Sequence, residues 1–163
     1  MKDWSPMSDP SLQGDPATLE AIAHGVLSVV NSRRRNGVLL VKPYYAEFAG
    51  PGAAVGGEFD RDCLAAIPIG NLQLLTPQNS TERQTAYRIR LQWLKLTSRF
   101  TVIDAPAVRS RQILEQFEQY FERDQVYQVS HAALAMVVGV FPQTMAETRG
   151  RHALSFIKPR NSP

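Results

Sequence analysis

The segment that most constrains the fold is residues 131–151, HAALAMVVGVFPQTMAETRGR. Leu134 and Val138 are four residues apart, so both lie on one face of a first helix. Gly139 follows, and glycine ends a helix at little steric cost because it adopts positive φ. Pro142 suits the first position of a second helix, where its missing N–H would be unpaired in any case. The pattern therefore predicts two short helices joined by a tight turn, a helix-turn-helix.

Other residues of this segment follow or break the same pattern. Ala135 is small where the second helix must pack closely, Val140 packs under the turn, and Met145 continues the buried face. Phe141 stands at the cap position of the second helix, where Ser or Thr would accept a bond from a free N–H. Thr148 takes a buried place at which an aliphatic residue is usual. Two helices joined at a glycine also occur in proteins that bind no DNA, so a packing role is the alternative interpretation.

The second helix leaves polar side chains that can reach base edges or phosphates of a DNA duplex. We predict that DNA contacts come from Pro142, Gln143, Thr144, Glu147, Thr148, Arg149, Arg151 and Lys158. Residues 1–80 carry six basic and eight acidic side chains, whereas residues 81–163 carry twelve basic and seven acidic ones. A polyanion would be drawn to the positive half, although a solvated basic tail explains the same asymmetry.

Composition limits the class of protein. The chain has 163 residues, of which 44% are hydrophobic, enough for a packed core. No apolar run approaches the ~18 residues of a membrane span, and the first residues do not resemble a secretory signal. A single cysteine, Cys63, allows no internal disulfide and suits a reducing compartment. We therefore expect a cytoplasmic protein.

The chain divides into four predicted parts. They are a flexible arm over residues 1–14, a small α/β region over 15–78, a connecting and dimerising helix over 79–104, and a helix-turn-helix domain with a basic tail over 105–163. The fold class expected is mainly α. Its C-terminal helix-turn-helix domain is winged-helix-like with a truncated wing, and its small N-terminal region is mixed α/β.

Local patterns place the remaining elements. Asp15 can cap a helix with Pro16 at its first position, and helical spacing continues from there to about residue 36. We predict a buried strand over 38–42, a glycine-rich loop over 46–57 and a short strand over 126–129.

Residues 81–100 fit both a strand and a helix, and we favour the helix. Its apolar residues would form one stripe of Tyr87, Leu91 and Leu94 and an opposite stripe of Ile89, Trp93, Leu96 and Phe100. A helix that is apolar on two sides is buried on two sides. We therefore predict a homodimer with its contact on this helix.

The order of elements over residues 81–151 resembles that of the C-terminal half of the Crp/Fnr family of bacterial regulators. The resemblance rests on SRQILEQFEQYF, an amphipathic helix within 107–123, followed by VYQVSHAALAMVVGVFPQTMAETR. It implies that the first long helix is the dimer seam and the last helix is the recognition helix. The chain is too short for that family's nucleotide-binding barrel, and residues 46–70 lack its phosphate-binding cassette, so we expect no nucleotide and no cofactor.

No catalytic or metal motif is present. His24, His131 and His152 have no metal-ligand spacing, and GxSxG, HExxH and P-loop patterns are absent. Asp60 and Asp62 are interpreted as acidic turn residues near Cys63. We predict a non-enzymatic DNA-binding transcriptional regulator. The alternative is an adaptor whose degenerate helix-turn-helix binds a protein, and a third interpretation is a small ligand-binding or catalytic domain.

Overall fold

The computed structural model describes residues 5–156 and has a mixed α/β architecture. Of these described residues, 53% are helical, with the 3-10 turns included, and 15% are in strands. The strands form two small three-stranded antiparallel sheets, with orders β4-β1-β6 and β3-β2-β5. The expectation of a mainly α protein is therefore wrong, because residues 28–75 supply two sheets.

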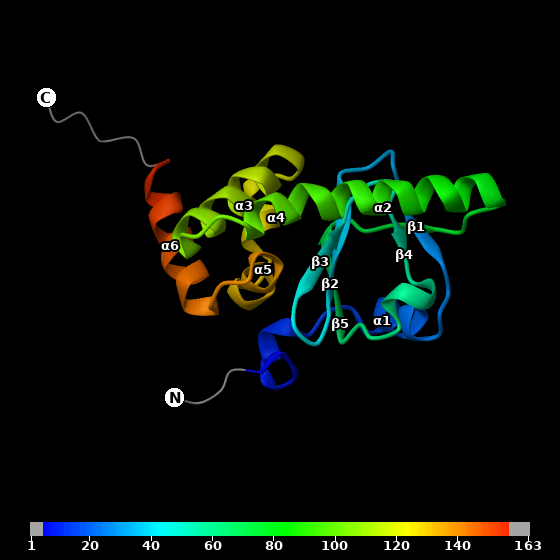
Figure 1. Ribbon diagram of the computed structural model, residues 1–163, viewed down its shortest axis with the longest axis horizontal. Coiled ribbons are helices and arrows are strands. Elements are labelled where there is room, and N and C mark those ends of the chain that lie inside the picture. Colours follow the sequence, from blue (N-terminus) through cyan, green and yellow to red (C-terminus); the bar gives the residue numbers. More distant parts are fainter. Residues whose placement is uncertain (1–4, 157–163) are drawn as a thin grey trace, which may run out of the picture.

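Among these described residues, one α-helix precedes the six strands, and the other five α-helices follow them. The helices are α1 (Pro16–Ala23), α2 (Ser80–Thr101), α3 (Pro106–Tyr120), α4 (Arg123–Tyr127), α5 (His131–Val138) and α6 (Pro142–Leu154). The strands are β1 (Ser28–Val30), β2 (Asn36–Val41), β3 (Ala46–Ala49), β4 (Ala54–Val55), β5 (Ala65–Gly70) and β6 (Leu74–Leu75). In Figure 1, α2 runs along the top, the sheets lie below one half of it, and α3 to α6 gather at its other end.

Strand β2 is buried along its whole length, as the sequence predicts for residues 38–41. Alternate side chains of a strand point to opposite faces of the sheet. Leu39 accordingly joins the core that is shared with α3 and α5, whereas Val38 and Leu40 join a second core beneath β1 and β4. A central strand with two apolar faces therefore connects the two halves of the molecule.

The N-terminal half departs from the sequence expectations in two elements. Helix α1 is capped by Asp15 as predicted, but it ends at Ala23 because Gly25 has φ +75 and turns the chain into β1. Residues 33–35 therefore lie in a turn before β2 and not at a helix end. The segment 46–57 is not a plain loop either, since it contains β3 and β4.

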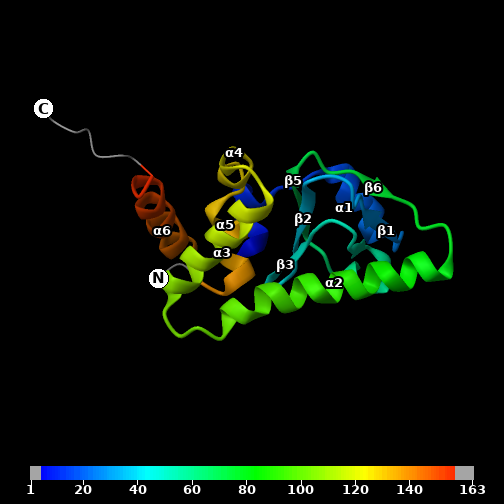
Figure 2. The same cartoon turned by 90° about the horizontal axis from the view of Figure 1, so that it is seen from above.

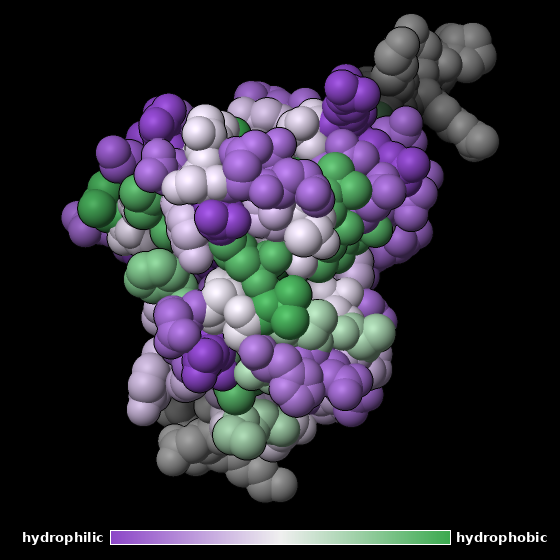
Figure 3. Space-filling view, turned by 90° about the vertical axis from the view of Figure 1, so that its right-hand side faces the viewer, coloured by the Kyte–Doolittle hydropathy of each residue, from purple (hydrophilic) through white to green (hydrophobic). Residues whose placement is uncertain are grey.

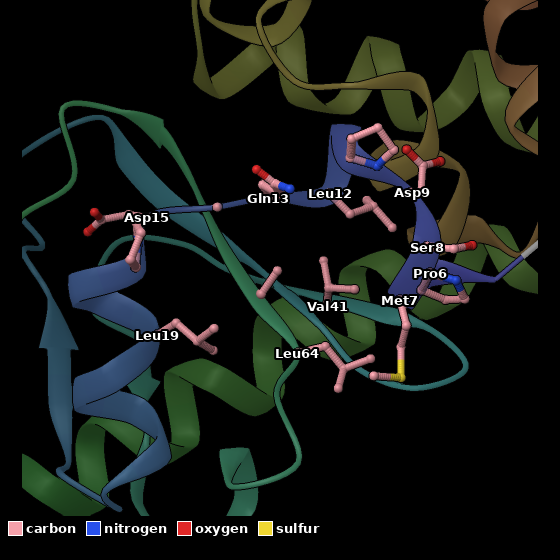
Figure 4. A pocket seen from close by; sticks show the side chains of 14 residues that line it. Pro6, Met7, Ser8, Asp9, Leu12, Gln13, Asp15, Leu19, Val41 and Leu64 are labelled. Carbon is pink, nitrogen blue, oxygen red and sulfur yellow. The ribbon is translucent and has the colours of Figure 1, made fainter.

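The first residues of the described chain pack against the body. They form the 3-10 turns η1 (Pro6–Ser8) and η2 (Pro10–Leu12), and Leu12 is buried in the core with Val41. Figure 4 shows Met7 and Leu12 from this segment around a pocket whose other side includes Val41 and Leu64. The prediction of a flexible arm is thus wrong for residues 5–14.

Helix α2 confirms the helical interpretation of residues 81–100. Asn79 caps it by accepting a bond from the Glu82 N–H at 2.9 Å. Trp93 packs edge-on against Phe48 with ring centroids 5.2 Å apart, whereas Leu91 is exposed. One predicted stripe therefore faces the cores, and the other is partly open to solvent. Figure 2 shows α2 running past the sheets toward the helical half.

The helical half differs from the expectation in one element. Residues 126–129 were predicted as a strand, but Val126 belongs to the short helix α4 and Val129 follows it, both buried. Among residues 5–156, no strand follows α6, so the described chain has no wing. Over the same residues, no helix has both the length and the apolar character needed to cross a bilayer.

The surface at the sheet end is mixed in character. Figure 3 views the side of the molecule opposite to α6, and apolar side chains gather there in a patch bordered by hydrophilic ones.

Candidate nucleic-acid interface

Helices α5 and α6 form the pair that the sequence predicts. The Ser130 side chain caps α5 by accepting a bond from the Ala133 N–H at 3.2 Å. Gly139 ends α5 with φ +68 and ψ +43, the left-handed conformation expected there. Helix α6 begins at Pro142, and the Phe141 side chain supplies no cap bond, also as expected.

The inner faces of the two helices are as predicted. Leu134, Ala135, Val138 and Met145 are fully buried and belong to the core that includes Phe48. Every side chain of residues 132–138 is buried, so α5 is enclosed on all sides. Helix α6 is therefore the element of the pair that offers an open face.

The open face of α6 carries four of the predicted contact residues. Gln143 and Glu147 are exposed one turn apart, with 3.3 Å between Gln143 Nε2 and Glu147 Oε1. Arg151 continues the helix beyond them and is exposed, while Thr144 is half-buried beside Gln143. Pro142, the fifth, is half-buried at the helix start. These side chains can meet a ligand without a change in the fold.

Arg149 is buried, so its predicted role in phosphate contact is wrong. The side chain is 3% exposed. Its Nη1 donates to the Val129 carbonyl at 2.6 Å and its Nη2 donates to the Val126 carbonyl at 2.9 Å. These carbonyls lie at the end of α4 and just after it, and the Val126 carbonyl also accepts a bond from the Val129 N–H at 3.1 Å. Arg149 therefore ties α6 to α4.

Two further predicted contacts are not on the open face. Thr148 is buried and donates from Oγ1 to the Thr144 carbonyl at 2.9 Å. This bond satisfies the hydroxyl at the place where an aliphatic residue is usual, so Thr148 is a packing residue. Lys158 lies outside the described residues.

Both histidines of the helical half hold α6 in place. His131 Nδ1 lies 3.1 Å from Arg149 Nη1, and burial together with the Arg149 charge lowers the pKa of His131. His152 Nε2 lies 3.0 Å from Glu118 Oε1, which joins α6 to α3. His152 is buried, whereas His131 stays exposed at the start of α5.

The exposed positive charge of the described second half is unevenly distributed. Residues 104–156 carry five arginines and six carboxylates. The basic excess of the described C-terminal half lies on α2, where Arg88, Lys95 and Arg99 are exposed at spacings of seven and four residues. Of the four basic residues at the end of the sequence, Arg149 is buried, Arg151 is exposed on α6, and Lys158 and Arg160 lie outside the described residues.

A buried group of charges was missed by the sequence reasoning. It consists of Lys42, Glu47, Asp60, Asp62 and Arg90, which we call the ionic cluster. Asp60 is 1% exposed and lies 3.1 Å from both Lys42 Nζ and Arg90 Nη1. Burial raises the pKa of Asp60, but the bonds and charge of Arg90 outweigh it and hold the pKa below 3.8. Asp60 is therefore not a solvated turn residue, whereas Asp62 is exposed as expected.

We predict that two glycines of the helix pair respond to alanine with opposite signs. A Cβ at Gly139 or Gly150 meets no atom within 4 Å, so space does not distinguish them. Gly139→Ala should lower the free energy of unfolding by about 1–2 kcal/mol, since its φ is left-handed. Gly150→Ala, inside α6, should raise it by up to about 1 kcal/mol. Urea denaturation measures both, and the same sign for both variants would contradict the geometry.

The described residues contain no group of His, Cys, Asp and Glu side chains suited to holding a metal. No protein-family model, no curated protein and no solved structure matches the chain. The function must therefore be inferred from the geometry of the site.

Proposed function

We propose that this chain is a cytoplasmic, DNA-binding transcriptional regulator that presents the N-terminal end of α6 to the major groove. The observation that supports this most is the open face of α6, with Gln143, Glu147 and Arg151 exposed on a helix whose inner face is buried. Helix α6 also lies at the extreme end of the molecule in Figure 1, where a duplex could approach it.

The exposed side chains are suited to different parts of a duplex. Gln143 is near the start of α6, the part of a recognition helix that reaches base edges, and glutamine pairs with adenine. The half-buried Thr144 offers a methyl group to thymine, and Glu147 can accept from cytosine N4. Arg151, one turn beyond Glu147, is placed for a phosphate.

The homodimer belongs to this proposal. Major-groove readers with a single helix pair commonly act as symmetric dimers. Leu91 is exposed on α2 between Arg88 and Lys95, and it offers an apolar contact for a second copy.

The proposal predicts that a residue contacting base edges and a residue contacting phosphate affect DNA affinity differently. Gln143→Ala should cost about 1–3 kcal/mol on the preferred site and little on random DNA. Arg151→Ala should weaken binding to all sequences and reduce the salt slope by about 1. Fluorescence anisotropy with a selected site and with random duplex, at about 50 and about 200 mM salt, measures both.

A matched control is Arg61→Ala, because Arg61 is exposed in the half that contains the sheets and pairs with the nearby Glu58. It should leave both affinities unchanged. Arg149 is unsuitable as a phosphate variant, since its loss would disturb the fold. If the unmodified protein fails to bind selected or random duplex even at low salt, the proposal is wrong.

An adaptor that binds another protein is the second candidate. Phe141 is 75% exposed at the turn between α5 and α6. An exposed aromatic ring next to α6 favours a protein partner, and the slight acidic excess of residues 104–156 disfavours a polyanion. Absence of DNA binding in the anisotropy experiment would favour this candidate.

A further inference from the structure

A cavity of about 400 Å³ lies between α2 and the β3–β4 side of the sheets. It is bordered by the ionic cluster and by three aromatic side chains, Tyr45, Phe59 and Tyr87. Cavities of this size accommodate small molecules, and a few polar groups among apolar walls are typical of ligand sites. No residue of the open face of α6 lines the cavity.

The cations of the cluster have almost no hydrogen-bonding capacity left for a ligand. Lys42 Nζ has three N–H groups, and it donates to the Phe59 carbonyl at 2.6 Å and contacts Asp60 and Asp62 at 3.1 and 2.9 Å. Arg90 Nη1 donates to the Ala54 carbonyl and Asp60, and Nη2 donates to Glu47 and Asp60. Arg90 Nε alone has no acceptor. An anionic ligand would therefore compete with bonds that already exist.

The carboxylates, in contrast, retain acceptors at the cavity. Two cations face three carboxylates, so the ionic cluster carries a net charge of −1. The Asp62 side chain is 57% exposed and bonds Lys42 through Oδ1. Among the described residues, Asp62 Oδ2 has no hydrogen-bond partner. The accessible charge of the cavity is therefore negative, and Asp62 Oδ2 can accept a hydrogen bond from a ligand.

The aromatic walls favour the same ligand charge. The Phe59 ring is 72% exposed and packs edge-on against Tyr87, with centroids 5.8 Å apart. Ring faces attract ammonium groups, and the rings also offer apolar area to the body of a ligand.

We propose that this cavity binds a small organic cation, a primary ammonium carried on an apolar or aromatic body. The ammonium donates to Asp62, and the body packs on Phe59 and Tyr87. The proposal does not depend on the DNA contacts, because the cavity and the open face of α6 share no residue, although Leu91, the proposed dimer contact, borders the cavity.

The first test titrates the full chain with phenethylammonium and follows backbone amides by NMR. Shifts should concentrate at Phe59, Asp62 and Tyr87. 3-Phenylpropionate, an anion of similar size, should bind at least about tenfold more weakly, and neutral 2-phenylethanol should fall between them. No shift at these three amides up to about 10 mM, the range of weak ligands, would overturn the proposal, as would equal binding of the anion.

Variants give the second test. Phe59→Leu and Asp62→Asn, both at exposed positions, should each weaken phenethylammonium binding about fivefold to tenfold. The controls are Tyr44→Leu and Glu58→Gln, whose exposed side chains do not line the cavity. Circular dichroism verifies that each variant folds. If the controls weaken binding as much as the cavity variants, the ligand binds elsewhere and the proposal fails.

Discussion

Replacing Arg90 with methionine is expected to lower the free energy of unfolding by about 3–5 kcal/mol, because Glu47 loses its cation and the buried Asp60 keeps only one cation, Lys42. Asp60 is almost completely buried and receives two bonds from the Arg90 guanidinium. After the substitution, Lys42 and the Gly56 N–H would be its remaining partners. Urea denaturation of the two proteins measures the loss.

Arg88→Met is the matched control, since Arg88 is exposed two residues earlier on α2. It should change the free energy of unfolding by less than about 0.5 kcal/mol.

The pH dependence of unfolding is a second measurement of the effect of Arg90. Asp60 has a pKa below its usual 3.8, so its contribution is present above pH 3.8 and is lost as the pH falls through the lowered value. Without Arg90, burial raises this pKa, and acid unfolding should begin at a higher pH. A loss of less than about 1 kcal/mol would show that the charge pair contributes little.

The helix pair could be predicted from the sequence because its determinants are local. Ser130 caps α5 from the residue before it, and Gly139 supplies the left-handed conformation that ends it. Leu134 and Val138 face the core because i and i+4 share a helix face. Strand β2 was predicted for the same reason, as a short apolar run before a lysine.

The burial of Arg149 could not be predicted in this way. Its partners are the carbonyls of Val126 and Val129, which are 23 and 20 residues earlier in the chain. Their position depends on α4, and VYQV is rich in residue types that favour strands. Since α4 is a single short helix between α3 and α5, tertiary packing decides its conformation.

Strand β1 was not predicted, because its hydrogen-bond partners are also distant in the sequence. Residues 26–30 continue the helical spacing of α1, but Val29 pairs with Ala54 and Leu75. Neither partner is near in sequence, so the strand gains its hydrogen bonds only in the folded chain. Gly25 was the available signal, because a glycine with positive φ ends a helix.

One residue of the ionic cluster, Arg90, stands out in the sequence. Arg90 is three residues after Tyr87 and four before Leu94, so it lies within the apolar stripe of α2. A charge in a stripe that is otherwise apolar requires a buried partner. The sequence did not identify Asp60, which is 30 residues away, but it indicated that such a partner exists.

Gly56→Ala is expected to destabilise the protein by about 3–5 kcal/mol, through backbone strain and a steric clash together. Gly56 has φ +90 and ψ −151, a conformation that is essentially restricted to glycine. A Cβ there would lie 2.0 Å from the Val26 carbonyl oxygen, which is backbone and cannot rotate away. The Gly56 N–H also donates to Asp60 Oδ2 at 2.8 Å, so any shift of this residue disturbs the ionic cluster.

Gly25→Ala separates the two causes, because Gly25 has φ +75 but its Cβ would meet only the flexible end of Arg61, at 3.1 Å. It should cost about 1–2 kcal/mol, the penalty of the left-handed conformation. The difference between the two variants in urea denaturation then measures the clash with Val26. Equal losses would mean that the chain relaxes around the new methyl group, and in that case the close approach of Gly56 to Val26 does not hold the β1–β4 pair in register.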